Sequence, residues 1–184
     1  ENAHNDNADH NKWQEEGKTG EEIDFESKNW NLLEGLRYVV PDSFDFTLQT
    51  IGIYENTDIM IKACVILIHK IGLQRELLEA DEMEIKKSNN TMENAYDVIL
   101  TNEDYTVGNI LNEELYETFY KEHEILSYVG FKKMHPHDTD SILRVAFNQP
   151  NAGKSNVKEI LTTVMSDAVA KINKIKGCFD GTRK

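Results

Sequence analysis

Alternating apolar and polar positions along the chain predict several half-buried β-strands. Phe44, Phe46 and Leu48 alternate with polar residues, so they would share one face of a strand. The predicted strands are residues 36–40, 44–49, 96–101, 127–134 and 141–147. Pro41-Asp42 and His135-Pro136-His137-Asp138 are predicted turns, because proline cannot donate a hydrogen bond to a strand ladder.

Three other segments carry apolar residues three or four positions apart, which predicts amphipathic helices. They are residues 57–78, 107–120 and 156–176. Thr57 or Asp58 is expected to cap the first helix, and Gly177 is expected to end the last one.

These elements divide the chain into four parts. Residues 1–35 are polar with few apolar anchors, which predicts loop, short strands or disorder over about the first 30 residues. Residues 36–78 hold a strand and a helix, and the polar segment 79–93 is predicted to be a linker and domain boundary. Residues 94–180 run strand, helix, strand, strand, helix. The predicted fold class is α+β, a small antiparallel sheet with two helices packed on one face.

The charge of the chain limits the classes of function. With 20 basic and 33 acidic residues the formal net charge is −13, so little direct contact with nucleic acid is expected. No apolar run approaches the roughly 18 to 20 residues that cross a bilayer. The start is polar and acidic rather than a secretory signal, so we expect an intracellular protein in the cytoplasm or nucleus. The chain begins with Glu1 rather than Met, as a processed product or a fragment would.

Cys64 and Cys178 are far apart in the sequence and lie in apolar, helix-like segments. We interpret both as buried free thiols in a reducing compartment, with a disulfide as the alternative. Two cysteines alone do not supply the four ligands of a structural zinc site.

Three sequence patterns could carry chemistry. Asn151-Ala152-Gly153-Lys154-Ser155 resembles the end of a phosphate-binding loop, but the required earlier glycine is Asn148, so a turn into a helix is predicted. His135 and His137, near Asp138 and Asp140, could bind a metal, although a hydrogen-bonded turn is favoured. A run of five glutamates is interpreted as the solvated face of a helix and its exit. They are Glu113, Glu114, Glu117, Glu122 and Glu124. No catalytic residue, metal or cofactor is therefore expected.

Three blocks of residues 94–178 resemble the eleventh-subunit family of eukaryotic and archaeal RNA polymerases. Asp104-Tyr105-Thr106-Val107-Gly108-Asn109-Ile110-Leu111 is similar to the family's DHTLGNLL text. Val129-Gly130-Phe131 followed by His135-Pro136-His137 is similar to its aGY…PHP text. Ser141-Ile142-Leu143-Arg144-Val145 is similar to its iLRIqT strand, and the three blocks stand in the family's order. The chain departs from the family at Tyr105 for His, at Phe131 for Tyr, and in the order His-Pro-His.

Residues 36–78 carry a second resemblance. Val40-Pro41-Asp42-Ser43-Phe44-Asp45-Phe46 leads through Gly52 into a long helix, as in the third-subunit family, where a final strand precedes the helix of the dimerisation domain. The metal-binding cysteine cluster of some third subunits is absent. The two families usually form a heterodimer of separate chains, so a fusion resembles the arrangement in large DNA viruses, and a viral protein could also lie in the virion.

The resemblance implies a dimerisation fold and a non-catalytic role as a platform for the two large catalytic polymerase subunits. The implied partners are those subunits and the rest of a third-subunit-like domain. The expected interface residues are Ile59, Ala63, Ile66, Leu67, Ile71, Thr106, Val107, Gly108, Asn109, Leu111, Leu115, His135, Pro136, His137, Ile160, Leu161, Val164, Ala168 and Ile172. Asp at Ile66 or Ile160 is expected to collapse the fold, because a buried unpaired charge is costly.

Two other functions fit the sequence. The chain could be a self-contained interaction module, such as a homodimer, unrelated to transcription. It could also be a small α+β enzyme using His135, His137 and Asp138, in which case it should bind a metal.

Overall fold

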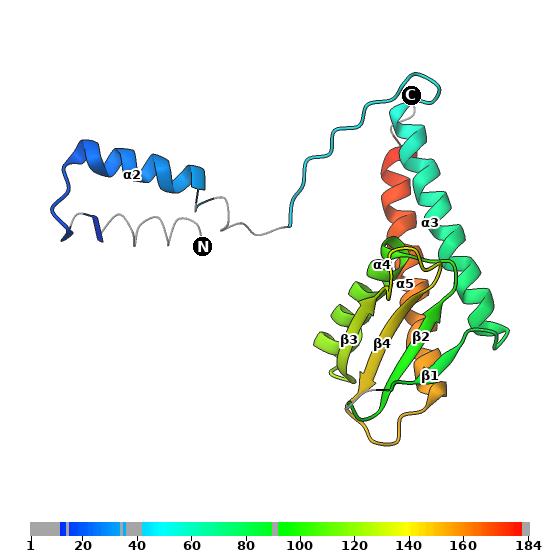
Figure 1. Ribbon diagram of the computed structural model, residues 1–184. Coiled ribbons are helices and arrows are strands. Elements are labelled where there is room, and N and C mark those ends of the chain that lie inside the picture. Colours follow the sequence, from blue (N-terminus) through cyan, green and yellow to red (C-terminus); the bar gives the residue numbers. More distant parts are fainter. Residues whose placement is uncertain (1–11, 14, 34, 36–41, 90–91, 182–184) are drawn as a thin grey trace. The chain divides into compact units, whose positions relative to one another are not determined.

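A computed structural model describes residues 12–13, 15–33, 35, 42–89 and 92–181 (Figure 1). The chain forms two compact units, Glu1–Leu48 and Gln49–Lys184. The strand predicted at 36–40 lies outside the described residues.

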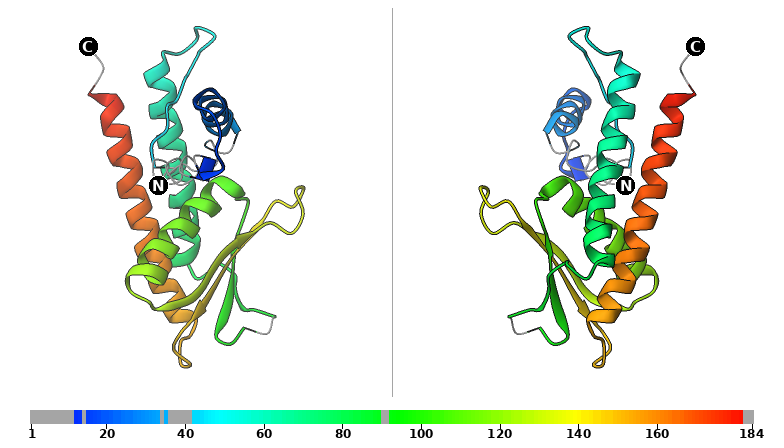
Figure 2. Two further views of the ribbon diagram at one scale, coloured as in Figure 1. Left: turned by 90° about the vertical axis from the view of Figure 1, so that its left-hand side faces the viewer. Right: turned by 90° about the vertical axis from the view of Figure 1, so that its right-hand side faces the viewer.

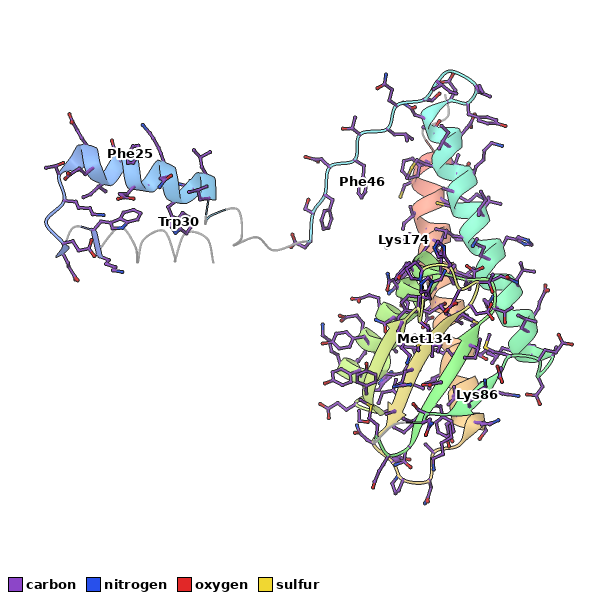
Figure 3. All side chains as sticks on the ribbon, viewed as in Figure 1. Phe25, Trp30, Phe46, Lys86, Met134 and Lys174 are labelled. Atoms are coloured by element: carbon purple, nitrogen blue, oxygen red, sulfur yellow. The ribbon has the colours of Figure 1, made fainter. Side chains whose placement is uncertain are left out.

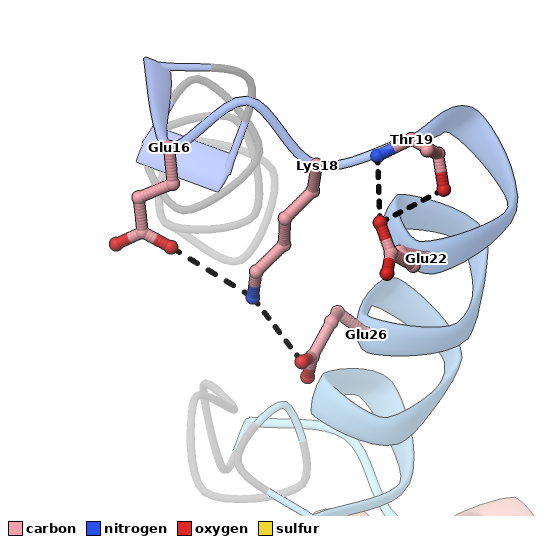
Figure 4. Close-up of polar contacts among 5 residues, drawn as sticks. All are labelled: Glu16, Lys18, Thr19, Glu22 and Glu26. Carbon is pink, nitrogen blue, oxygen red and sulfur yellow. Dashed lines mark hydrogen bonds and ion pairs between the residues drawn. The ribbon is translucent and has the colours of Figure 1, made fainter.

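The first unit contains helix α2 (Gly20–Leu33), where the sequence predicted irregular structure. Thr19 donates from both its backbone N and its Oγ1 to Oε2 of Glu22, at 2.8 Å each (Figure 4). The Glu22 carboxylate thus satisfies the backbone N–H of Thr19 before the helix, which is one half of a capping box. The prediction for this segment was wrong because it weighed composition and overlooked the Thr-x-x-Glu capping signal.

Residues 43–50 form no strand, so the strand predicted at 44–49 was also wrong. Phe44 is 65% exposed and Phe46, labelled in Figure 3, is 89% exposed. Alternation supplies an apolar face, but a strand also needs a neighbouring strand to pair its backbone groups. The described part of the chain provides none for this segment.

The second unit is built on a four-stranded antiparallel sheet in the order β1-β2-β4-β3 (Figure 1). The strands are β1 (Ile85–Lys87), β2 (Ala95–Leu100), β3 (Leu126–Lys132) and β4 (Ser141–Phe147). The predicted α+β class and the three longer strands are confirmed. The predicted linker 79–93 instead contributes β1, which pairs with β2. One compact unit thus joins the parts that the linker was expected to separate.

The helices lie on one face of this sheet (Figure 2). They are α3 (Asn56–Glu79), α4 (Tyr105–Leu115), the π-helical turn η2 (Tyr116–Glu122) and α5 (Lys154–Asp180). All three predicted helices are present, but two cap predictions were wrong. Residue Glu55 precedes α3 without a side-chain cap. Helix α5 continues past Gly177, which needs no special backbone conformation there, and ends at Asp180 with Gly181 as its C-terminal cap.

One hydrophobic core fills the space between the helices and the sheet. Leu143 and Val145 of β4 are fully buried and belong to the same core cluster as the fully buried Leu161 and Val164 of α5. None of the helices within the described residues combines the length and apolar composition of a membrane span.

Candidate assembly surface

Helix α3, which carries the third-subunit resemblance, packs along α5 of the domain that carries the eleventh-subunit resemblance (Figure 1). Ile71 is fully buried, and Cys64 and Leu78 are 6% and 3% exposed in the same core cluster as the sheet. Burying side chains of this size stabilises the contact by roughly 1.5 to 3 kcal/mol each. The two regions of resemblance therefore form one hydrophobic core.

Two polar contacts attach α3 to the loop between β2 and α4. Lys70 Nζ donates to Glu103 Oε2 at 2.8 Å. Gln74 Nε2 donates to the backbone oxygen of Thr101 at 2.9 Å, and Gln74 is 2% exposed. Because both bonds reach the same short loop, they fix the lengthwise position of α3 as well as its rotation.

The first two blocks of the polymerase resemblance meet at the ring of Phe131. Tyr105 at the start of α4 lies edge-on to Phe131, with ring centroids 5.7 Å apart. A side-chain carbon added at Gly108 would overlap the Phe131 ring, so only glycine allows this approach. Asp104 caps α4 by accepting from Thr106 N. These motif residues therefore set how α4 packs on β3.

The third block supplies Arg144 on β4, which faces Asp97 across the β2–β4 ladder. Arg144 Nε and Nη2 donate to the two Asp97 oxygens at 2.6 and 2.7 Å. The hydrogen bond from Arg144 lowers the pKa of the Asp97 carboxyl, against the opposing effect of burial. The pair joins two strands on the sheet face that the helices leave open.

The structure separates the predicted interface residues into buried, half-buried and exposed groups. Most of the buried ones form the internal core; they are Ile71, Val107, Gly108, Leu111, Leu115, Ile160, Leu161, Val164, Ala168 and Ile172. Leu67 and Ile59 are half-buried. The exposed ones are Ala63, Ile66, Thr106, Asn109, His135, Pro136 and His137.

Ile66 was predicted to lie inside the paired helices and is 56% exposed. The helix is rotated so that Ile61 and Cys64 face inward together with Ile71, which was predicted to do so. Apolar residues occur on both sides of α3, so the sequence pattern did not fix which side is buried. The expectation that Asp at Ile66 collapses the fold is therefore withdrawn.

The histidine turn and the phosphate-loop-like segment have local structural roles. His137 N donates to His135 Nδ1 at 3.2 Å, and His135 N donates to Asp138 Oδ2 at 2.9 Å. Gly153 is the residue before α5, and its N donates to Asn156 Oδ1. No cluster of three potential metal-ligating side chains occurs among the described residues. The predicted turns are thus present in both places.

Two predictions about single side chains were wrong. Glu114 is 8% exposed rather than solvated, and both of its oxygens accept from Lys171 Nζ of α5 at 2.7 Å. The run of acidic residues does not distinguish Glu114 from its neighbours. Its position one turn after buried Leu111 nevertheless places it on the inner face of α4. Cys64 is a buried free thiol as predicted, but Cys178 is exposed near the end of α5.

No protein-family model matches this sequence, and no curated protein matches it. The polymerase resemblance therefore rests on the residues described above.

Proposed function

We propose that the chain is a non-catalytic assembly subunit of a multisubunit DNA-directed RNA polymerase, forming part of the platform for the two large catalytic subunits. One observation carries the proposal. The blocks that resemble the eleventh subunit pack against one another, and the helix that resembles the third subunit shares their core. A chain that joins both resemblances in one compact unit has the arrangement that the subunit heterodimer implies.

The resembling blocks also contain exposed residues whose side chains lie outside the hydrophobic core. Thr106 and Asn109 on α4 and the turn 135–137 are exposed, although their neighbours Val107 and Gly108 are buried. A loop contact, from Asn102 N to Asp140 Oδ1 at 2.9 Å, ties the start of α4 to the end of this turn. These exposed residues lie near one end of the sheet, and we assign them to the contact with a large subunit.

Residues 43–54 support a second partner contact. Phe46, Ile51 and Ile53 are 89%, 91% and 73% exposed. Exposed apolar residues in such a run mark interaction sites. The rest of a third-subunit-like domain is the partner that the resemblance implies for this segment.

The test is co-purification. The tagged chain is expressed with the two large polymerase subunits of the same source, and both should be retained with it. The variant Thr106→Ala/Asn109→Ala/His137→Ala should retain much less of them at an unchanged melting temperature. Lys174→Ala, on exposed α5 surface, is the matched control and should behave as wild type. Failure of the wild-type chain to retain either large subunit would rule out the proposal.

A further inference from the structure

Helix α3 carries a second stripe, apolar except for Lys70, on the side away from Ile61, Cys64 and Ile71. Its residues follow one another at intervals of four, three, four, three and four. They are Ile59, Ala63, Ile66, Lys70, Leu73 and Leu77, called here the outer seam. Ile66 and Leu73 are 56% and 43% exposed, whereas the opposite side of the helix is buried at Ile61, Cys64 and Ile71. Leu77 also packs against the core and Lys70 binds Glu103, but the packing of the unit does not explain the exposed seam residues Ala63, Ile66 and Leu73.

The spacing of the outer seam identifies the kind of surface that fits it. Intervals of three and four are those of helices that pack side by side at a shallow angle, with side chains interlocking along the contact. Near the end of α3 the seam opens into a pocket of about 430 Å³, whose walls include Leu73, Leu77 and Ala80. The matching partner surface is therefore another helix with an apolar stripe.

Charges beside the seam select the partner. Lys62, His69 and Glu76 form a row at seven-residue intervals along one flank, and all three are exposed. If a second α3 lies antiparallel, with Ile59 opposite Leu77 of the other copy, Lys62 lies opposite Glu76 at each end of the contact. A parallel arrangement would instead place Lys62 beside Leu67 of the other copy. Opposite charges in these flanking positions set the orientation of paired helices.

We propose that two copies of the chain pair antiparallel through the outer seam of α3. The Lys62 ammonium also lies over the ring of Tyr54, 4.5 Å from its centroid. Pairing hides the apolar stripe of each copy, with a Lys62–Glu76 ion pair at both ends. This inference does not depend on the proposed polymerase function, because it concerns the chain alone.

The first experiment measures the mass of the purified full chain by light scattering after size exclusion. Low salt, a reducing agent and pH 8 are used. The expected mass is about twice the 21.2 kDa of one chain. Ile66→Asp should give monomers. Val65→Asp is the matched control, since Val65 is 48% exposed but lies outside the seam. A monomeric wild type, or equal behaviour of the two variants, would overturn the proposal.

The second experiment tests the antiparallel orientation by charge reversal. Lys62→Glu or Glu76→Lys alone should weaken the dimer roughly tenfold, since each turns two attractive pairs into repulsive ones. The double variant Lys62→Glu/Glu76→Lys restores opposite charges and should recover the wild-type dissociation constant. If the double variant is as weak as the single ones, the antiparallel pairing is wrong. Neither experiment involves polymerase subunits, so its failure is distinct from failure of the co-purification.

Discussion

Lys70 of α3 holds the buried carboxylate of Glu103, with 2.8 Å between Lys70 Nζ and Glu103 Oε2. The Glu103 side chain is 5% exposed and that of Lys70 is 38% exposed, so the two partners are unequally shielded from water. Replacing Lys70 by Met should lower the free energy of unfolding by about 2 to 3 kcal/mol, because it leaves a buried charge without a partner. Urea denaturation measures the change.

The control is Arg75→Met, five residues further along α3. Arg75 Nε lies 2.8 Å from Glu79 Oε1, the same distance, but both side chains are about half exposed. Its loss should change stability by less than about 0.5 kcal/mol. Adding Glu103→Gln to Lys70→Met should recover part of the lost stability. Equal effects of the Lys70 and Arg75 variants would show that burial of Glu103 has no energetic role.

Gly108 allows the Phe131 ring to approach α4, so Gly108→Ala should be destabilising. The added carbon would overlap the ring and force it to move, which costs about 1 to 3 kcal/mol in a packed core. Gly72→Ala is the control, since apart from the neighbouring helix backbone nothing lies within 4 Å of its added carbon. It should stabilise α3 by about 0.5 to 1 kcal/mol, because alanine favours helix over glycine. Thermal melts of both variants check the opposite signs.

The second unit was largely predictable because its patterns have one buried side. On α5 the predicted stripe positions Val157, Leu161 and Val164 are all fully buried, and β4 has the predicted bounds 141–147. Periodicity identifies the buried side when polar residues occupy the other. The core and its residues therefore followed from the sequence.

The candidate interface was less predictable, for two physical reasons. Helix α3 is apolar on both sides, so its period fits either rotation, and the structure turns Ile61 inward and Ile66 outward. Pairing is also a property of two segments. Residues 44–49 alternate without acquiring a neighbouring strand, whereas the three residues of β1 pair with β2 although they lie in a polar segment.

Acid should reveal the contribution of the Asp97–Arg144 pair. The hydrogen bond from Arg144 lowers the pKa of Asp97 in the folded protein. The pair therefore stabilises the fold at pH values above 3.8, which is the ordinary pKa of an aspartate. This stability is lost as the pH falls through the lowered pKa of the folded state. Asp97→Asn should therefore lower the melting temperature near neutral pH and lose less stability than wild type on acidification below about pH 4. Parallel curves of melting temperature against pH for the two proteins would contradict this.

Replacement by Asp should strongly destabilise the fold at Ile160 and change its stability little at Ile66. Ile160 is 5% exposed within the core on α5, so Ile160→Asp buries a charge without a partner and should cost about 3 kcal/mol or more. Ile66 is 56% exposed, so Ile66→Asp should keep the fold, with a change of about 0.5 kcal/mol in the isolated monomer. Circular dichroism and urea denaturation at a concentration low enough to avoid self-association separate the two. An unfolded Ile66→Asp variant would place this side chain inside the fold and would remove the outer seam as a free surface.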